Sequence, residues 1–201
     1  MALPPTTEQL QHELDQFIAQ GWTALDTEDG VERWNKTLTG VSQRAFMGVG
    51  TINKPADEVL AAILDPERRK TWDPYFLEGR TLADIDADTK VVYQVAAAGG
   101  PASHRDLCLL RVVHRLPDGK IAVITKSTER PDCPPVSGYV RADMLIGGFV
   151  VAPEGTASCR VTVCAGTDPH GWMPGFVAKL VGAKQPMVVA RLRDYLMKAL
   201  P

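Results

Sequence analysis

The end of the chain constrains the fold most, because it carries a long amphipathic helix pattern. Between residues 174 and 199, apolar residues recur at helical spacing in two groups that begin at Phe176 and Val188. Pro174 suits the first turn of a helix, and Pro186 predicts a kink or a short interruption near residues 184–185. The pattern predicts a C-terminal helix over about residues 174–199, whose apolar face must pack on another layer.

The opposite face of this predicted helix is basic. Five basic side chains stand against the single acid Asp194: Lys179, Lys184, Arg191, Arg193 and Lys198. A basic stripe is the solvated face of a helix that caps a core, or it belongs to a lid that closes a ligand cavity and contacts an anionic membrane surface. In the second case, we expect Lys179 and Lys184 to be the membrane contacts.

The middle of the chain supplies the second layer, because it consists almost entirely of short strand patterns separated by turns. The predicted strands are 22–25, 31–38, 42–52, 76–85, 90–97, 105–114, 120–127, 138–146, 149–153 and 158–167. Helices are predicted over about 6–20, 56–64 and 67–72. Strands this close in sequence favour an antiparallel meander. We therefore predict an α+β fold in one domain, residues 1–201, with a curved antiparallel sheet packed on the C-terminal helix.

Composition and charge limit the possible functions. The net charge of −2 argues against a general nucleic-acid binder. No apolar run approaches the about 18–20 residues of a membrane span, and the N-terminus lacks the features of a secretory signal. The four cysteines show no metal-ligand spacing, so we expect no metal site and reduced thiols in the cytoplasm: Cys108, Cys133, Cys159 and Cys164.

Common catalytic motifs are also not evident. Ser103, His104 and Asp106 are close in sequence, but neighbours on a strand point to opposite faces and cannot converge as a triad. No nucleotide-binding or metalloprotease pattern occurs elsewhere. We expect no catalytic residue and no cofactor.

Arginines in apolar surroundings are more informative. On the predicted strand 105–114, alternation places Arg105, Leu107, Leu109 and Arg111 on one face. A buried guanidinium needs an acid, a carbonyl or a ligand anion. Each arginine is therefore a partner in a structural salt bridge or a polar anchor that orients a mostly apolar ligand. Arg141 raises the same question.

Five segments, in order and at the expected spacing, resemble the START domain, the lipid-transfer domain of the steroidogenic acute regulatory protein family. They are RRKTWDP (68–74), HRDLCLLR (104–111), KSTERPDCPPVSGYVRA (126–142), GGFVVAP (147–153) and DPHGWMPGFVAKLV (168–181). The resemblance implies a helix-grip fold, in which a curved sheet grips the C-terminal helix and one lipid lies in a tunnel between them. It also implies transfer or sensing of a sterol, phospholipid or ceramide without covalent chemistry.

The resemblance also assigns residues by position. Arg105 matches the arginine of the family's Arg-Asp pair, and Arg111 matches the cavity arginine of sterol-binding members. Those members place an acid opposite this arginine, whereas here ungapped counting gives Val92, with Gln94 nearby. We therefore expect Arg111 to meet a ligand anion or Gln94. The predicted lipid-binding residues are Arg105, Arg111, Gln94, Leu107, Leu109, Arg141, Phe149, Met173, Phe176, Val177 and Leu180.

Together these observations predict a monomeric, cytoplasmic protein, not an enzyme, that carries one sterol, phospholipid or other amphiphile and contacts an anionic membrane peripherally. Ligand exchange requires the terminal helix, or the loops near residues 99–101 and 136–138, to move. Two alternatives stay open. One is a polyketide cyclase-like enzyme of the same superfamily, with His114 or Tyr93 transferring protons. The other is a ligand-sensing interaction module without transfer activity.

Overall fold

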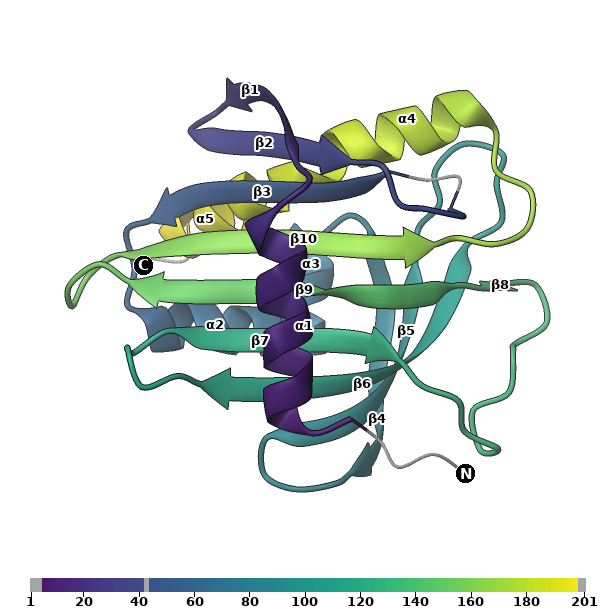
Figure 1. Cartoon of the computed structure of the whole chain (residues 1–201), viewed down its shortest axis with the longest axis horizontal. Helices are drawn as coiled ribbons and strands as arrows, with labels where there is room; N and C mark the ends of the chain where they lie inside the picture. The colour runs from purple at the N-terminus through teal and green to yellow at the C-terminus, as the bar shows by residue number, and fades with distance from the viewer. Residues whose placement is uncertain (1–4, 42–43, 199–201) are drawn as a thin grey trace.

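A computed structural model describes residues 5–41 and 44–198, and the side chains of residues 178–181 lie outside that description. In the described residues, ten strands form a single curved sheet (Figure 1). The strands are β1 (Thr23–Glu28), β2 (Val31–Lys36), β3 (Ala45–Ile52), β4 (Phe76–Asp84), β5 (Thr89–Ala96), β6 (Arg105–Arg115), β7 (Ile121–Ser127), β8 (Val140–Arg141), β9 (Asp143–Pro153) and β10 (Cys159–Asp168).

The strand order is β1-β2-β3-β10-β9-β7-β6-β5-β4, with antiparallel neighbours throughout, and the short β8 pairs in parallel with β6. The predicted meander is therefore correct within two runs of strands, but β3 joins the last strand, β10, from Phe46 opposite Ala165 to Ile52 opposite Cys159. Local sequence carries no signal for this pairing, because it joins segments more than a hundred residues apart.

Strand β9 corrects one predicted boundary. We expected two strands interrupted at Gly147 and Gly148, but one strand runs from Asp143 to Pro153. Gly148 has a φ of 141°, and a Cβ at this position would collide with the carbonyl oxygen of Val123 on β7. The glycines therefore bend the sheet without breaking the strand, since only glycine tolerates this backbone conformation and this close approach.

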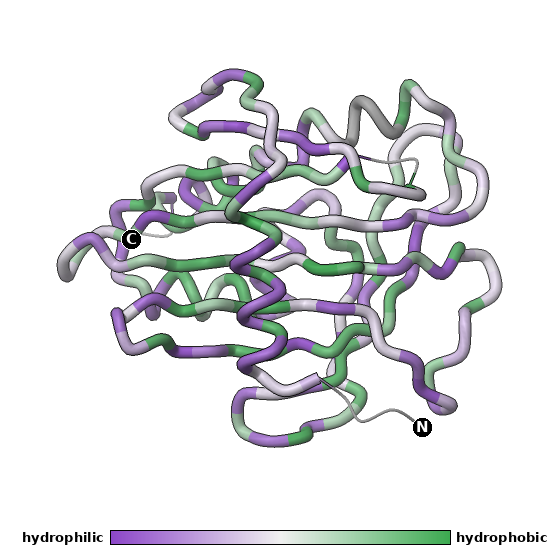
Figure 2. The backbone as a smooth tube through the Cα atoms, in the orientation of Figure 1, coloured by the Kyte–Doolittle hydropathy of each residue, from purple (hydrophilic) through white to green (hydrophobic). Residues whose placement is uncertain are grey.

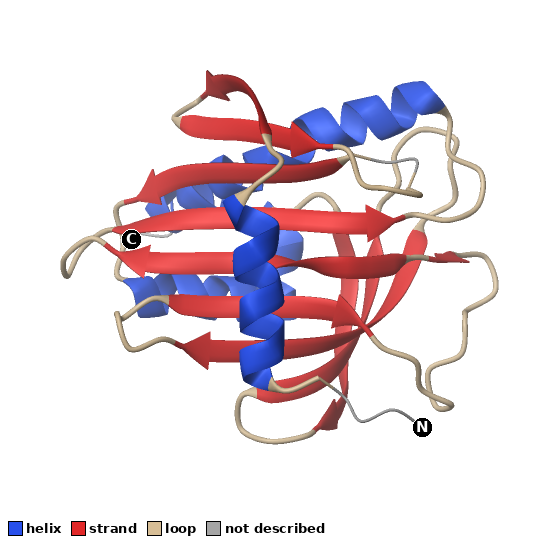
Figure 3. Ribbon diagram, in the orientation of Figure 1, coloured by secondary structure: helices blue, strands red, loops and turns tan. Residues whose placement is uncertain are grey.

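The helices cover both faces of the sheet (Figures 1 and 3). They are α1 (Thr7–Ala19), α2 (Ala56–Leu64), α3 (Pro66–Trp72), α4 (Gly175–Lys184), the 3-10 turn η1 (Gln185–Met187) and α5 (Val188–Lys198). Helix α1 crosses the convex face, where the fully buried Leu10 and Leu14 pack with Cys108 and Ile124. The other helices lie on the concave side. The predicted interruption of the C-terminal helix is present, because η1 separates α4 from α5.

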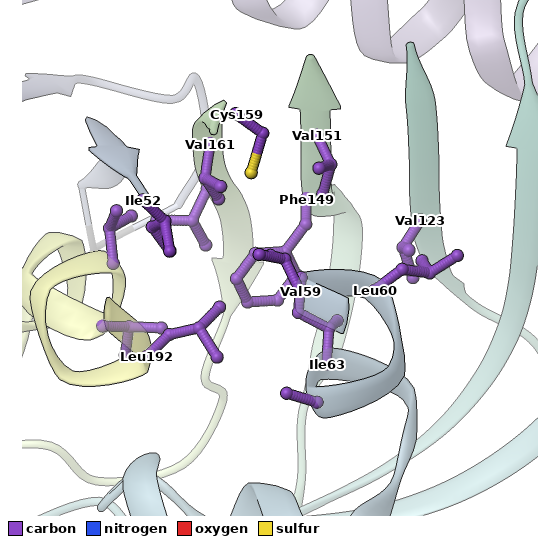
Figure 4. Packing of buried hydrophobic residues seen from close by; sticks show 14 of the residues in the cluster. Ile52, Val59, Leu60, Ile63, Val123, Phe149, Val151, Cys159, Val161 and Leu192 are labelled. Atoms are coloured by element: carbon purple, nitrogen blue, oxygen red, sulfur yellow. The ribbon is translucent and has the colours of Figure 1, made fainter. Parts of the chain in front are cut away.

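The main core lies between α2, α5 and the concave face of the central strands (Figure 4). Figure 2 shows hydrophobic residues gathered on these central strands, with hydrophilic residues on the β1–β2 hairpin and the surface turns. Trp72 is buried in this cluster and donates its indole N–H to the carbonyl oxygen of Ala62. No helix among the described residues is both long and apolar enough to cross a membrane.

The packing of α5 makes a prediction about stability. Leu192→Ala should lower the free energy of unfolding by about 2–5 kcal/mol, because Leu192 is 0% exposed and its truncation leaves a cavity. Met197→Ala, on the same helix but 47% exposed, is the matched control and should change it by no more than about 0.5 kcal/mol. Urea unfolding measures both, and similar values for the two variants would show that α5 does not close the core.

Candidate binding cavity

A cavity of about 210 Å³ lies between the concave face of the sheet and the helical layer. Strands β3, β4, β5, β6, β7, β9 and β10 form its floor, and α2, α3, η1, the start of α5 and the segment before α4 form its roof. Most of its wall is apolar: Phe46, Ile63, Val92, Leu107, Leu109, Phe149, Val163, Met173 and Val188. The space between sheet and helices is therefore hollow, and mostly apolar side chains line it.

Seven of the predicted site residues line this cavity: Gln94, Arg105, Leu107, Leu109, Arg111, Phe149 and Met173. The four on β6 share one face because alternate residues of a strand point the same way. The alternate residues Cys108, Leu110 and Val112 point to the convex side, where they pack in the cluster that includes Leu10 and Leu14 of α1. Strand alternation in the sequence therefore located the inner face of β6 correctly.

Arg105 is a structural clamp. Its side chain is 4% exposed and donates hydrogen bonds to four main-chain carbonyls: Ser103 at 2.5 Å, Pro169 at 3.0 Å, His170 at 2.9 Å and Trp172 at 3.2 Å. Burial lowers the pKa of the guanidinium. No carboxylate among the described residues pairs with it. The four carbonyls satisfy the guanidinium, so it needs neither an acid nor a ligand anion as a partner. Arg105 instead fixes the loop that leads into α4.

Asp106 pairs with Arg141 on the other face of β6. Asp106 is 0% exposed, and Arg141 donates to it through Nη2 at 2.8 Å and Nε at 3.2 Å. Arg141 also donates to the carbonyl oxygens of Cys133 and Pro134. Arg141, a predicted lipid contact, does not line this cavity: its guanidinium holds the loop after β7, because alternation turns Asp106 away from the cavity.

Arg111 has no such partner. It lines the cavity half-buried, and its guanidinium makes no hydrogen bond or ion pair within the described part of the chain. Burial lowers its pKa, and the nearby Arg69 lowers it further. The register places Lys90 opposite Arg111, whereas Gln94 lies opposite Leu107. The expected contact between Arg111 and Gln94 does not form, so the cation remains available to a ligand.

The lining residues that were not predicted from the sequence include Arg69, Asp73 and Gln185. Arg69 forms an ion pair with the buried Asp73 at 2.9 Å, and its guanidinium lies 4.7 Å from the ring centre of Phe76. The side-chain oxygen of Gln185, on η1, is buried without a hydrogen-bond donor. Arg69 and Asp73 lie in the RRKTWDP segment, which could have drawn attention to them, but nothing in the local sequence marks Gln185.

The start of α4 packs beside the cavity, because its Val177 clusters with the lining residues Ala98 and Met173. Val177 is buried against Ala98 and Ala102 of the loop after β5, and a Cβ at Gly100 would lie 3.2 Å from Val177 Cγ2. Val177 belongs to this contact and not to the cavity wall. The prediction that Phe176 lines the interior is wrong, because its side chain points outward and is 68% exposed. The side chains of Lys179 and Leu180 lie outside the described residues.

Comparison with known proteins gives the family. A family model of the START domain matches residues 20–199. The chain is 28% identical to Protein ENHANCED DISEASE RESISTANCE 2-like of Arabidopsis thaliana, over 80% of this chain and 24% of that protein. It is 29% identical to START domain-containing protein 10 of Mus musculus, over 78% of this chain and 54% of that protein. The chain thus spans about half, or less, of the relatives it matches.

Solved structures agree on the fold. Human StAR-related lipid transfer protein 5 superposes with a TM-score of 0.87 at 21% identity, covering 95% of this chain and 94% of that one. Human STARD10 superposes with a TM-score of 0.85 at 22% identity, covering 98% of this chain and 82% of that one. These similarities show a helix-grip fold, as the sequence predicted.

The clamp on the loop before α4 can be tested directly. Arg105→Leu should lower the free energy of unfolding by about 2–4 kcal/mol, because it leaves several buried carbonyls without a donor. It should also speed hydrogen exchange at residues 170–173 and 175–177. Arg80→Leu removes an exposed arginine and should cost less than about 1 kcal/mol. An Arg105→Leu protein with wild-type unfolding and exchange would show that these hydrogen bonds contribute nothing.

Proposed function

Since this chain belongs to the START domain family, we propose that it binds one lipid in the cavity between its sheet and its C-terminal helices and transfers it between membranes. The observation that carries this proposal is the cavity itself, with its apolar wall and its few fixed polar groups. Such a wall stabilises a hydrocarbon body by roughly 25 cal/mol for each Å² removed from water. The polar groups would orient the head of the ligand.

Loading requires the cavity to open. Its 210 Å³ is smaller than the roughly 300–1,000 Å³ of typical ligand pockets, so a lipid must displace part of the cover. The start of α4 is the part that moves in this proposal, because Val177 packs there in a small cluster with Ala98, Ala102, Tyr75 and Met173, apart from the main core. Helix α5 stays in place, since Leu192 and Leu196 are fully buried.

The moving segment also carries the membrane contact in this proposal. Trp172 and Phe176, just before and within the first turn of α4, are each 68% exposed. Exposed aromatic side chains favour the interface between water and lipid. Lys184, at the end of α4, is exposed, and with Lys179 it would add attraction to an anionic surface. A membrane that holds these side chains would also draw the start of α4 away from the cavity.

The two alternatives gain little support. His114, a candidate proton-transfer residue of the cyclase-like enzyme, lies on the convex side with its Nδ1 3.3 Å from Gln11 Oε1 of α1. Burial raises the pKa of Tyr93 to about 12, so its phenol is not a base at neutral pH. A ligand-sensing module without transfer activity would bind lipid but not move it, so a transfer assay distinguishes it from a carrier.

Native mass spectrometry tests the binding proposal. After incubation with vesicles of mixed lipid composition, the protein should retain one lipid for each chain, because the proposed site is the single cavity between the sheet and the helices. Leu109→Trp, which places a larger side chain in the cavity, should retain less while still folding cooperatively. A wild-type protein that never retains lipid would rule out the carrier function.

Membrane contact through the aromatic pair gives a second prediction. The double variant Trp172→Ser/Phe176→Ser should transfer a fluorescent lipid between anionic vesicles about tenfold more slowly, because less apolar surface enters the interface. Its affinity for lipid in solution should not change. Ile85→Ser, which removes an exposed apolar side chain after β4, is the matched control and should transfer at the wild-type rate. Equal rates for all three proteins would exclude these aromatic residues from docking.

Charge reversal tests the electrostatic part of the contact. Lys179→Glu/Lys184→Glu should slow transfer between anionic vesicles and have little effect with neutral vesicles, since each lysine contributes about 1 kcal/mol or less near an anionic surface. Lys120→Glu, in the turn between β6 and β7, is the control. If the double variant is no slower than this control on anionic vesicles, the basic residues of α4 have no docking role.

A further inference from the structure

The distribution of charge around the cavity points to a ligand class. We propose that the cavity selects lipids with an anionic head group, a carboxylate or a phosphate, and that Arg111 binds this group. The inference rests on the proposed function, because it assumes that a lipid occupies the cavity.

The cavity has an excess of cations. Among the described residues, four arginines and one carboxylate line it: Arg69, Arg80, Arg105, Arg111 and Asp73. The single carboxylate, Asp73, is already paired with Arg69 at 2.9 Å and also accepts a hydrogen bond from the backbone N–H of Tyr75. No acidic side chain of the lining is left to balance the remaining arginines.

Two of the remaining arginines are satisfied elsewhere. Arg105 uses its donors on the carbonyls of the loop before α4 and so has little capacity for a ligand. Arg80 is largely exposed, lies 4.8 Å from the ring centre of Tyr93, and is 3.9 Å from the carboxylate of Glu78. Water, Glu78 and the ring of Tyr93 therefore satisfy the guanidinium of Arg80. Arg111 is the lining arginine that combines partial burial with free donors.

The surroundings of Arg111 make an anion the favoured partner. Lys90 lies opposite it on β5, and the carboxylate of Asp84 pairs with that lysine at 2.5 Å. The inner face of β5 offers Val92 and Gln94, which carry no negative charge. Arg69 adds a second positive charge from the helical side, whereas the negative charge of Asp84, which raises the pKa of Arg111, is already engaged by Lys90. An uncompensated cation in this setting is costly, and a carboxylate or phosphate would offset that cost through charge-assisted, bidentate hydrogen bonds.

Other head groups fit this site less well. A neutral hydroxyl accepts a hydrogen bond from a guanidinium but leaves its charge uncompensated. A head group with a net positive charge would be repelled by Arg69 and Arg111 together. On the helical side, the buried oxygen of Gln185 lacks a donor and would accept a hydrogen bond from a hydroxyl elsewhere on the ligand. The cavity therefore suits an anionic amphiphile, with or without a second polar group.

Four probes with the same 18-carbon chain test this selectivity at neutral pH: oleic acid, oleoyl lysophosphatidic acid, mono-oleoylglycerol and oleylamine. Calorimetry should give at least one anionic probe a dissociation constant roughly 10- to 100-fold below that of mono-oleoylglycerol, the factor expected for a charge-assisted hydrogen bond in a site with little water. Oleylamine should bind more weakly than the neutral probe. Which anion binds more tightly distinguishes a carboxylate ligand from a phosphate ligand.

Substitution of Arg111 provides a second test of the selectivity. Arg111→Gln keeps hydrogen-bonding groups but removes the charge, so it should reduce the preference for the anion to about threefold or less. Arg115→Gln, on the same strand but exposed and bound to Asp57, is the matched control and should keep the wild-type preference. If Arg111→Gln does not fold, the four-probe series on the wild-type protein decides by itself.

The outcomes distinguish a failure of the proposed anion selectivity from a failure of the proposed lipid-binding function. Equal affinity for oleic acid, lysophosphatidic acid and mono-oleoylglycerol would overturn the anion selectivity and leave a lipid carrier intact. Retention of the preference in Arg111→Gln would remove Arg111 from the site. Failure of every probe to bind, together with no retained lipid in native mass spectrometry, would instead count against the proposed function.

Discussion

The uneven filling of the concave face is the constraint on which the other features depend. At one end of the sheet, α2 and α5 press apolar side chains against the central strands, and residues such as Val59, Val151 and Leu192 are fully buried (Figure 4). Towards the other end, where β6 begins, smaller clusters and the cavity replace this core. The first end provides stability, and so the second can remain hollow without unfolding the domain.

The charged side chains of β6 also differ in their roles, according to the face of the strand on which they lie and the partners that they find there. Successive residues of β6 point to opposite faces, so Arg105 and Asp106 cannot pair with each other. Asp106 instead joins Arg141 outside the cavity, and Arg105 binds the carbonyls of the loop before α4. Both interactions hold loops near the cavity end, which lack a large apolar core of their own. Arg111, six residues along the same face as Arg105, has neither kind of partner, and this difference separates a structural arginine from a candidate ligand contact.

The cover of the cavity combines firm and weak attachments. The hydrogen bonds of Arg105 fix the backbone just before α4, whereas Val177 is held by a small apolar cluster apart from the main core. The 3-10 turn η1 separates α4 from the deeply buried α5. In the proposed function, the start of α4 moves while the backbone before it and α5 remain anchored, as a lipid carrier requires if it is to exchange ligand and stay folded.

The sequence by itself determined the elements and their faces. Periodicity predicted the helices, nearly all the strands and the inner side of β6, because a residue's direction on a strand depends only on its neighbours. The family resemblance correctly supplied the helix-grip fold. Only the tertiary structure decided the pairing of β3 with β10, the partners of Arg105 and Arg141, the outward position of Phe176 and the unpartnered state of Arg111. Three of the four hydrogen bonds of Arg105, for example, cross more than sixty residues, and such contacts are set by how the whole chain packs, which no local pattern records.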